Sequence, residues 1–215
     1  VQAIFDSVNT LLNYVENGTD APKLSDFTTL GLADITTADQ LTLINSYLND
    51  TNTAVADIDS YDELQARLTA VKNILTDAAV ADLAAEEGID DVVASYVTTS
   101  ANLEALGFTY VDTSTTTATL VNAGQATTEV TPENIASVRL AIANSEDDLS
   151  ELQSFSALKT LIEDTAKAAN TIQAYGAGVS GAPVPTVADY TAIGVTGVNS
   201  LNVAAINSSL AEAGV

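Results

Sequence analysis

Clusters of carboxylates are the side chains of this sequence whose type and spacing could perform chemistry. Three short segments each carry four acids: Asp57, Asp59, Asp62 and Glu63; Glu86, Glu87, Asp90 and Asp91; and Glu146, Asp147, Asp148 and Glu151. Carboxylate oxygens are the ligands that calcium prefers, and the ion takes about six to eight of them. Two interpretations therefore stay open for these segments, a calcium site or the caps and solvated turns of helices.

The acids are not spaced as in an EF-hand loop, which alternates its acids around a central glycine and ends on a glutamate. Six of them remain candidates for a calcium ion that fixes two neighbouring modules together: Asp57, Asp59, Asp62, Glu146, Asp147 and Asp148. Paired carboxylates also catalyse glycoside hydrolysis, but aromatic residues, which usually line such clefts, make up only 5% of this chain. We expect no catalytic residues and no cofactor, with calcium as the open exception.

The composition excludes several other kinds of site. The chain contains no Cys, His, Met or Trp. Zinc sites of the usual kinds, thiol chemistry, histidine-based triads and haem ligation by these side chains are therefore ruled out. The sequence favours a protein that is not an enzyme.

The charge of the chain restricts its partners. Six Lys and Arg residues stand against 29 Asp and Glu residues, which gives a formal net charge of −23. Nucleic acid and anionic membrane surfaces are disfavoured because both would be repelled. No apolar run approaches the roughly 20 residues of a membrane-spanning helix. We predict no nucleic acid partner and no insertion into a membrane.

The helical elements that would position these residues recur along the chain. A shift of 94 residues superimposes apolar positions at helical spacing: Leu41 on Ile135, Ile44 on Val138, Leu48 on Ile142 and Leu68 on Ile162. A shift of 162 residues places Leu41, Ile44, Asn45, Ser46 and Leu48 on Val203, Ile206, Asn207, Ser208 and Leu210. The segment Asn9-Thr10 to Tyr14 likewise matches Asn170-Thr171 to Tyr175. The chain is therefore expected to be a window of a longer array of divergent helical units.

Two short stretches, LSDFTTLGL at 24–32 and VADYTAIGV at 187–195, show the start of a unit. Each predicts a short helix that ends at a glycine, and the stretch 103–108 is a more distant relative. A second helix is expected from Thr37, where Gln40 completes a capping box, to about Asn49, and a third from Ser60 to about Asp77. In the next copy, Thr131-Pro132-Glu133 predicts an N-cap with proline at the first helical position.

The fold class that follows is mainly α, with tandem small three-helix modules. Residues 78–96 are expected to add one or two helices broken at Gly88, and an insertion around 108–121 predicts a short β-hairpin because it is β-branched and partly alternating. The expected boundaries are 1–16 for the last helix of a preceding module, 21–97 for module A, 98–178 for module B with the hairpin, and 182–215 for the start of module C.

The stretches PTVADYTAIGVTGVNSLNVAAINSSLA (185–211) and APKLSDFTTLGLADITTADQLTLINSYL (21–48) resemble helical tandem repeats of very large bacterial surface proteins, including adhesins of the repeats-in-toxin type. The resemblance implies secretion to the bacterial cell surface, a place in a fibre, stalk or adhesin, and a spacer role. It carries over no catalytic residues, and the nonapeptide calcium motif of such proteins is absent.

We therefore expect a structural module that acts as a spacer or as a segment of a self-assembling filament. Its partners would be neighbouring copies of the module, joined head to tail, because a helix like 2–14 should follow 201–211 within a module. The alternative is a helical module that binds a host protein or cell-wall material, which an exposed apolar or aromatic patch on a helix would favour.

Overall fold

A computed structural model describes residues 1–87, 96–111, 120–122, 124–145, 152 and 154–213, with the side chains of 80–87 left out. These residues are mainly helical, which confirms the predicted class. They divide into two compact units. Unit 1 comprises residues 1–107 and 145–159, and unit 2 comprises residues 108–144 and 160–215.

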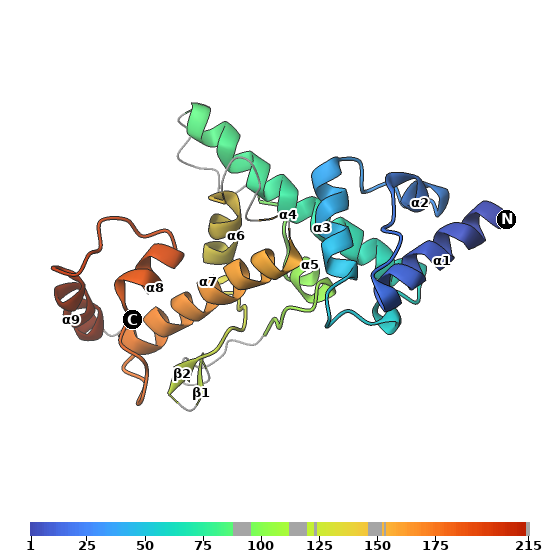
Figure 1. Ribbon diagram of the computed structural model, residues 1–215. Coiled ribbons are helices and arrows are strands. Elements are labelled where there is room, and N and C mark those ends of the chain that lie inside the picture. The colour runs from blue at the N-terminus through green and yellow to red at the C-terminus, as the bar shows by residue number, and fades with distance from the viewer. Residues whose placement is uncertain (88–95, 112–119, 123, 146–151, 153, 214–215) are drawn as a thin grey trace. The chain divides into compact units, whose positions relative to one another are not determined.

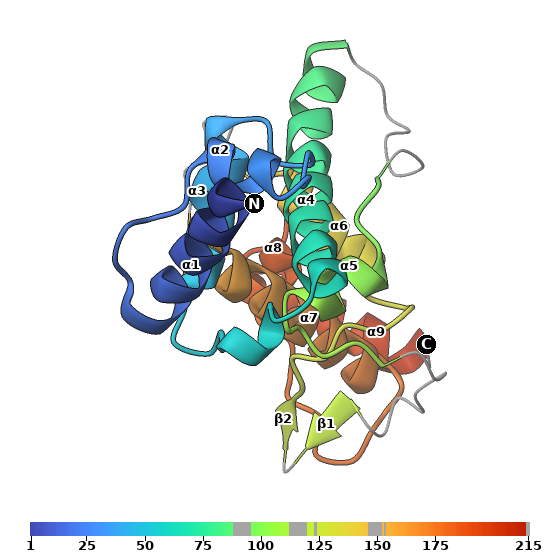
Figure 2. The ribbon, with the colours of Figure 1, turned by 90° about the vertical axis from the view of Figure 1, so that its right-hand side faces the viewer.

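The described residues of unit 1 form six helical elements and the first turn of a seventh. They are α1 (Gln2–Asn17), α2 (Leu24–Thr29), α3 (Ala38–Leu48), the 3-10 helix η1 (Val55–Asp57), α4 (Tyr61–Glu87), α5 (Ser100–Ala105) and the beginning of α7 (Phe155–Gly176). In Figures 1 and 2, α1, α2 and α3 lie together beside the N-terminal half of α4. The packed pairs are α1 with α2, α1 with η1, α3 with α4, and α4 with α5.

The core of unit 1 follows from apolar residues three and four positions apart. Leu43, Ile44 and Leu48 of α3 are buried, as are Leu68 and Val71 of α4. Each such side chain contributes roughly 1.5–3 kcal/mol when it leaves water. The packing of α3 against α4 is therefore a principal source of stability in this unit.

One carboxylate is buried inside unit 1 and holds two distant segments together. Asp77 of α4 is 0% exposed, and its two oxygens accept the backbone N–H groups of Val97 (2.7 Å) and Thr98 (2.9 Å). These two residues precede α5, whose first turn is capped by Thr99. The carboxylate thus fixes the approach of the chain to α5.

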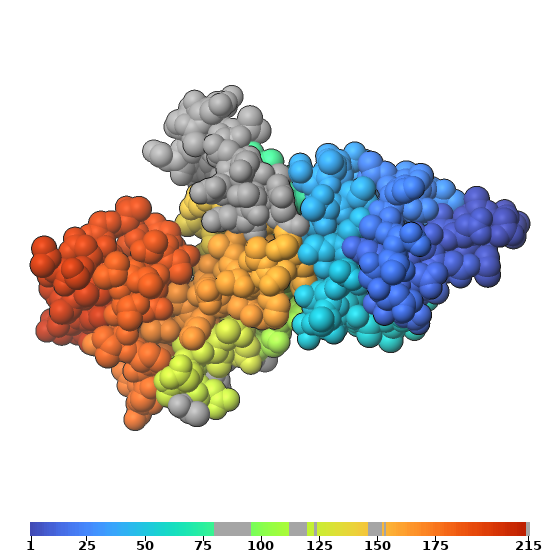
Figure 3. Space-filling model, viewed as in Figure 1, coloured from blue at the N-terminus to red at the C-terminus, as the bar shows by residue number. Residues whose placement is uncertain are grey.

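Unit 2 contains the short strands β1 (Val121–Asn122) and β2 (Gln125–Ala126), the helices α6 (Ile135–Ala143), α8 (Val187–Ala192) and α9 (Val203–Ala213), and the remainder of α7. Figure 1 shows α8 and α9 near the C-terminal end of α7. A Cβ on Gly176 of α7 would come 3.1 Å from Leu210 of α9, so these two helices are closely packed. In the space-filling view, the yellow-green residues of β1 and β2 lie beside the orange 177–185 loop (Figure 3).

The start of α6 differs from the prediction. The helix begins at Ile135 after the cap residue Asn134, and not at Pro132. Asn134 Oδ1 accepts the N–H of Thr131 (2.9 Å), and Asn134 Nδ2 donates to Asn170 Oδ1 of α7 (2.8 Å). This link to a residue far along the chain fixes the cap at Asn134, so Pro132 lies in the turn before the helix.

The strand pairing also differs from the hairpin expected around 108–121. Tyr110 pairs with Val130 in a parallel bridge, and Val121 pairs with Ala126 across a turn at Gly124. The hairpin is therefore shifted towards the C-terminus, and residues 112–119 lie outside the described part of the chain. Long-range pairing of this kind leaves no local pattern, because the partner of Tyr110 lies 20 residues away.

The other helix boundaries follow the local signals, with one exception. Thr37 accepts the N–H of Gln40 at the start of α3, and Ser60 and Glu63 form the expected capping box of α4. The expected end of the third helix near Asp77 is wrong, since α4 continues to Glu87. Residues 78–87 contain no glycine or proline, so nothing in them interrupts the helix.

Candidate interaction surface

The acids that the sequence offered as calcium ligands do not converge in the part of the chain that the structure describes. Asp57 Oδ2 accepts the N–H of Ala54 (2.6 Å) at the start of η1, and Asp59 and Asp62 are exposed. Among the described residues no three or more acids form a group that could hold a metal ion. Glu146, Asp147 and Asp148 lie outside those residues, so the candidate site that they form stays a prediction.

Asp59 and Glu63 form an exposed acidic pair at the start of α4. The hydrogen bond with Glu63 and the charge of Glu63 raise the pKa of Asp59. The pKa of Glu63 is lowered, chiefly by its hydrogen bond with Ser60. Glu63 is therefore favoured in its ionised form, in which it caps the helix. Two carboxylates alone provide fewer oxygens than a calcium ion needs.

A second polar cluster ties the loop after α2 to α4. Asp34 accepts hydrogen bonds from Thr69 Oγ1 (2.8 Å), from Lys72 Nζ (3.0 Å) and from Gln65 Nε2. Burial raises the pKa of Asp34, but the hydrogen bonds from Thr69 and Lys72 and the charge of Lys72 outweigh it, so the net pKa is lowered. Lys72 is thus engaged in an ion pair with Asp34.

Three six-residue helices, α2, α5 and α8, share one local geometry. Each begins with a side chain that accepts the N–H of the cap residue three positions earlier: Asp26 from Lys23, Asn102 from Thr99 and Asp189 from Thr186. Each buries one large side chain in the middle, namely Phe27, Leu103 and Tyr190. A glycine with a positive φ follows each helix: Gly31 (79°), Gly107 (85°) and Gly194 (82°).

Two of these short helices are followed by a longer helix that is fastened in the same way. In α3, Asn45 Nδ2 donates to the carbonyl of Pro22 (2.9 Å). In α9, Asn207 Nδ2 donates to the carbonyl of Pro185 (2.8 Å). The short helices α2 and α8 therefore agree in the acid that accepts the N–H of the cap residue, in a buried aromatic residue and in the glycine that follows, and α3 and α9 share one long-range hydrogen bond. This agreement is more than helical periodicity alone requires.

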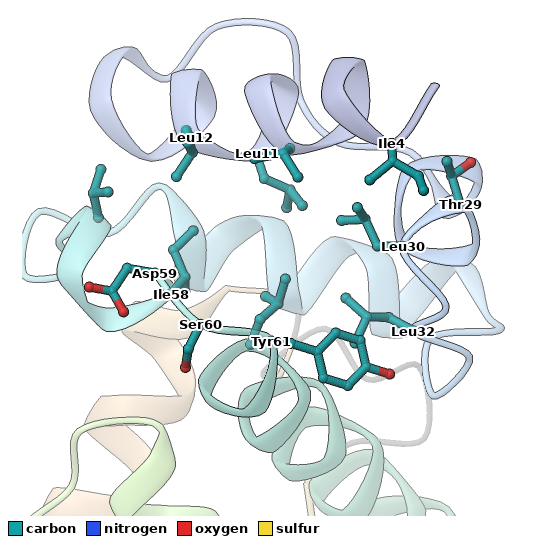
Figure 4. Close-up of a pocket in the computed structure, with 13 residues that line it drawn as sticks. Ile4, Leu11, Leu12, Thr29, Leu30, Leu32, Ile58, Asp59, Ser60 and Tyr61 are labelled. Atoms are coloured by element: carbon teal, nitrogen blue, oxygen red, sulfur yellow. The ribbon is translucent and has the colours of Figure 1, made fainter. Parts of the chain in front are cut away.

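An apolar groove of about 410 Å³ opens between α1, the end of α2 and the start of α4 (Figure 4). Its lining comprises Ile4, Val8, Leu11 and Leu12 of α1, residues Thr29, Leu30 and Leu32, and Val55, Ile58, Asp59, Ser60, Tyr61 and Leu64. The groove is open enough to leave several large side chains in water: Ile4 is 51% exposed, Val8 37% and Tyr61 54%. The first turn of α1, in dark blue, projects at the surface of unit 1 (Figure 3).

The sequence alone did not predict this groove. The apolar spacing of Ile4, Val8 and Leu11 indicates an amphipathic helix. Which of these side chains remains uncovered depends on the packing of α1 against α2, and that packing is a tertiary property. The groove combines the size of a binding pocket with a mainly apolar lining.

The chain matches no known family model, no curated protein and no solved structure. In the described residues, every helix is too short or too polar to cross a membrane. Any function must therefore be inferred from the geometry of this chain.

Proposed function

We propose that the chain is a structural repeat module of an extracellular bacterial adhesin or fibre, in which it acts as a spacer. The observation that carries this proposal is the shared geometry of α2–α3 and α8–α9, which unites the cap, the buried aromatic residue, the following glycine and the asparagine bond to a proline carbonyl. Divergent copies of one unit explain this agreement, since the polar residues elsewhere in the two stretches differ.

In the proposed role each helical unit would bury a face against its neighbour, as stacked repeats do. Stability in such arrays is the sum of unit terms and nearest-neighbour terms, so length can grow by adding units. The strong negative charge keeps a long surface protein soluble and separates neighbouring fibres. The resemblance of 21–48 and 185–211 to helical tandem repeats of bacterial surface proteins supports the same role and an extracellular location.

This function is tested by joining one, two and three copies of the chain in a single polypeptide. Small-angle X-ray scattering, recorded at dilution, measures the maximum dimension of each polypeptide. A spacer predicts equal increments of length per copy. The control joins the copies through a long glycine–serine linker, whose reach grows roughly as the square root of its length. Increments no more regular than those of the control would contradict the spacer role.

The groove favours a second candidate function, a helical module that binds a foreign ligand. An exposed apolar patch that includes Ile4, Val8 and Tyr61 is the feature that such a module needs. The test is nuclear magnetic resonance of the chain titrated with apolar and aromatic peptides. Saturable shifts confined to residues of the groove would support this function, and an unchanged spectrum would count against it.

A further inference from the structure

The start of α4 borders the groove, whereas the start of α7, also in unit 1, is covered by another helix. Phe155, the first residue of α7, packs edge-on against Tyr47 of α3, with ring centroids 4.9 Å apart. The backbone N–H of Phe155 donates to Ser46 Oγ, also of α3, over 2.9 Å. As a result Phe155 is only 5% exposed. The C-terminal part of α3 therefore covers the first turn of α7.

Tyr61 is the counterpart of Phe155 at the start of α4. Both residues follow a serine, Ser60 or Ser154, and both begin a long helix. Tyr61 nevertheless remains 54% exposed, with its hydroxyl 3.3 Å from the carbonyl oxygen of Gly31. Among the described residues, no helix covers the first turn of α4 as α3 covers that of α7.

The same contrast runs along the helices beside this turn. Two sequence matches together align α1 with α4. Residues 9–14 of α1 match 170–175 of α7, and Leu68 of α4 matches Ile162 of α7. Through α7, Ile4 therefore corresponds to Val71 and Val8 to Leu75. On α4, against which α3 packs, Val71 is 0% exposed and Leu75 is 7% exposed. On α1, Ile4 and Val8 are 51% and 37% exposed. The groove therefore presents the surface that an α3-like helix covers elsewhere in the same unit.

A helix of the α3 kind whose matching face is only partly covered is present in the chain. Helix α9 aligns with α3 through Asn207 and Ser208, the counterparts of Asn45 and Ser46. Ile44 and Leu48 of α3 are 0% exposed, whereas their counterparts Ile206 and Leu210 in α9 are only half-buried. The face of α9 that corresponds to the α4-facing side of α3 is therefore only partly covered: Leu210 packs against Gly176 of α7, and Ile206 stays accessible in part.

The geometry points to a second copy of this chain as the occupant of the groove. We infer that α9 of one copy docks between α1 and the start of α4 of the next copy, and that its Ser208 hydroxyl accepts the N–H of Tyr61 as Ser46 accepts that of Phe155. This interface rests on the proposed structural role, and it adds that modules associate without a covalent link. It is a head-to-tail contact, in which the two copies contribute different surfaces.

The distribution of charge is compatible with this contact. Although the chain carries 29 acids, α9 contains only Glu212, and the groove is lined by only one acid, Asp59. The repulsion between two copies therefore acts between their other surfaces, where salt screens it within about 10 Å at 0.1 M. Association is expected to strengthen as the salt concentration rises, as an apolar contact between acidic proteins should.

The test uses the whole chain and two substitutions, one on each side of the contact. Ile4→Asp places a charge in the groove, and Ile206→Asp places one on α9. Sedimentation velocity of the unaltered chain should show association that increases with concentration up to about 1 mM and extends beyond the dimer. Each variant alone should be monomeric. A mixture of the two should form a one-to-one complex and nothing larger, because one functional groove and one functional α9 remain.

Val184→Asp is the matched control, since Val184 is 60% exposed and belongs to neither surface. It should leave association unchanged, and circular dichroism should show that all three variants keep their helices. Ser208→Ala removes only the proposed hydrogen bond and should weaken association by about three- to tenfold. Rescue of this loss by Ser208→Thr would distinguish the hydroxyl from a general effect of the site.

Three results would overturn the inference. The first is a chain that stays monomeric at about 1 mM in high salt, and the second is association that neither aspartate variant affects. The third is a groove that binds an apolar dye equally well at all protein concentrations, which would indicate a foreign ligand. In each case equal length increments in the covalently joined copies would leave the spacer role standing, so the two proposals can fail separately.

Discussion

Tyr190 donates its hydroxyl hydrogen to Asn207 Oδ1 over 2.6 Å, and both residues are buried. Phe27 is the counterpart of Tyr190 in the other helix pair and has no hydroxyl. The counterpart of Asn207 is Asn45, whose Oδ1 is buried without a hydrogen-bond partner among the described residues. Asn45 Oδ1 thus lacks the donor that Asn207 Oδ1 receives from Tyr190, because Phe27 has no hydroxyl.

Phe27→Tyr should therefore stabilise unit 1 by about 1 kcal/mol, because a buried acceptor gains its donor. Tyr190→Phe should destabilise unit 2 by about 1–3 kcal/mol, because it leaves Asn207 Oδ1 unpaired. Urea denaturation followed by circular dichroism measures both changes. In the Asn45→Ala background the gain from Phe27→Tyr should vanish, and a gain of equal size there would show that the new hydroxyl acts elsewhere.

The glycines after α2 and α8 give a second, graded prediction. Gly31→Ala should cost about 1–2 kcal/mol, since the left-handed backbone at φ 79° is strained for any residue with a Cβ. Gly194→Ala should cost more, because its Cβ would also lie 3.0 Å from Leu140 Cδ2, whereas a Cβ at Gly31 would meet nothing within 4 Å. Thermal unfolding of the two variants makes the comparison, and equal costs would mean that Leu140 moves aside freely.

Asp77 is expected to be the most sensitive carboxylate of unit 1. In Asp77→Asn the amide can accept only one of the two N–H groups of Val97 and Thr98 and turns a donor towards the other. We expect a loss of about 1.5–3 kcal/mol, together with faster hydrogen exchange at these two amides. The exposed Asp62→Asn serves as control and should change stability by less than about 0.5 kcal/mol.

Asp34 predicts how unit 1 responds to acid. Its pKa is lower in the folded chain than in the unfolded chain, so its contribution to stability is present above the unfolded value of 3.8 and disappears as the pH falls through the folded value. Asp34→Asn should therefore be less stable than the unaltered chain at pH 7, by about 1–2 kcal/mol. Melting temperatures recorded between pH 7 and pH 2.5 should converge at the acid end. A gap that persists there would assign the loss to packing.

The parts of the fold that the sequence predicted are those set by neighbouring residues. Thr37 with Gln40 and Ser60 with Glu63 form capping boxes within one helical turn, so the sequence alone determines where α3 and α4 begin. The start of α6 could not be placed in this way, because the side chain of Asn134 is held by Asn170 of another helix. The sequence did not predict the pairing of Tyr110 with Val130 because here too the partner lies far along the chain.

The candidate surface was foreseen only in part. The match of Asn45-Ser46 with Asn207-Ser208 predicted an α3-like helix near the end of the chain, and the structure places α9 there. The groove required knowledge of which side of α1 faces α2, and the role of Ser46 required its contact with Phe155, 109 residues away. The acids were considered first because carboxylates can take part in chemistry, whereas the candidate surface is lined mainly by apolar side chains, four of them from α1.

Because the groove belongs to unit 1 and α9 to unit 2, the proposed contact joins two different surfaces and gives an assembly a direction. Two copies joined as proposed keep one empty groove and one undocked α9, so the two ends of such an assembly are chemically different. One end extends only by receiving a helix and the other only by offering one. Copies that carry Ile4→Asp would then act as terminators at the first end and those that carry Ile206→Asp at the second, and their mole fraction would set the mean number of copies per assembly.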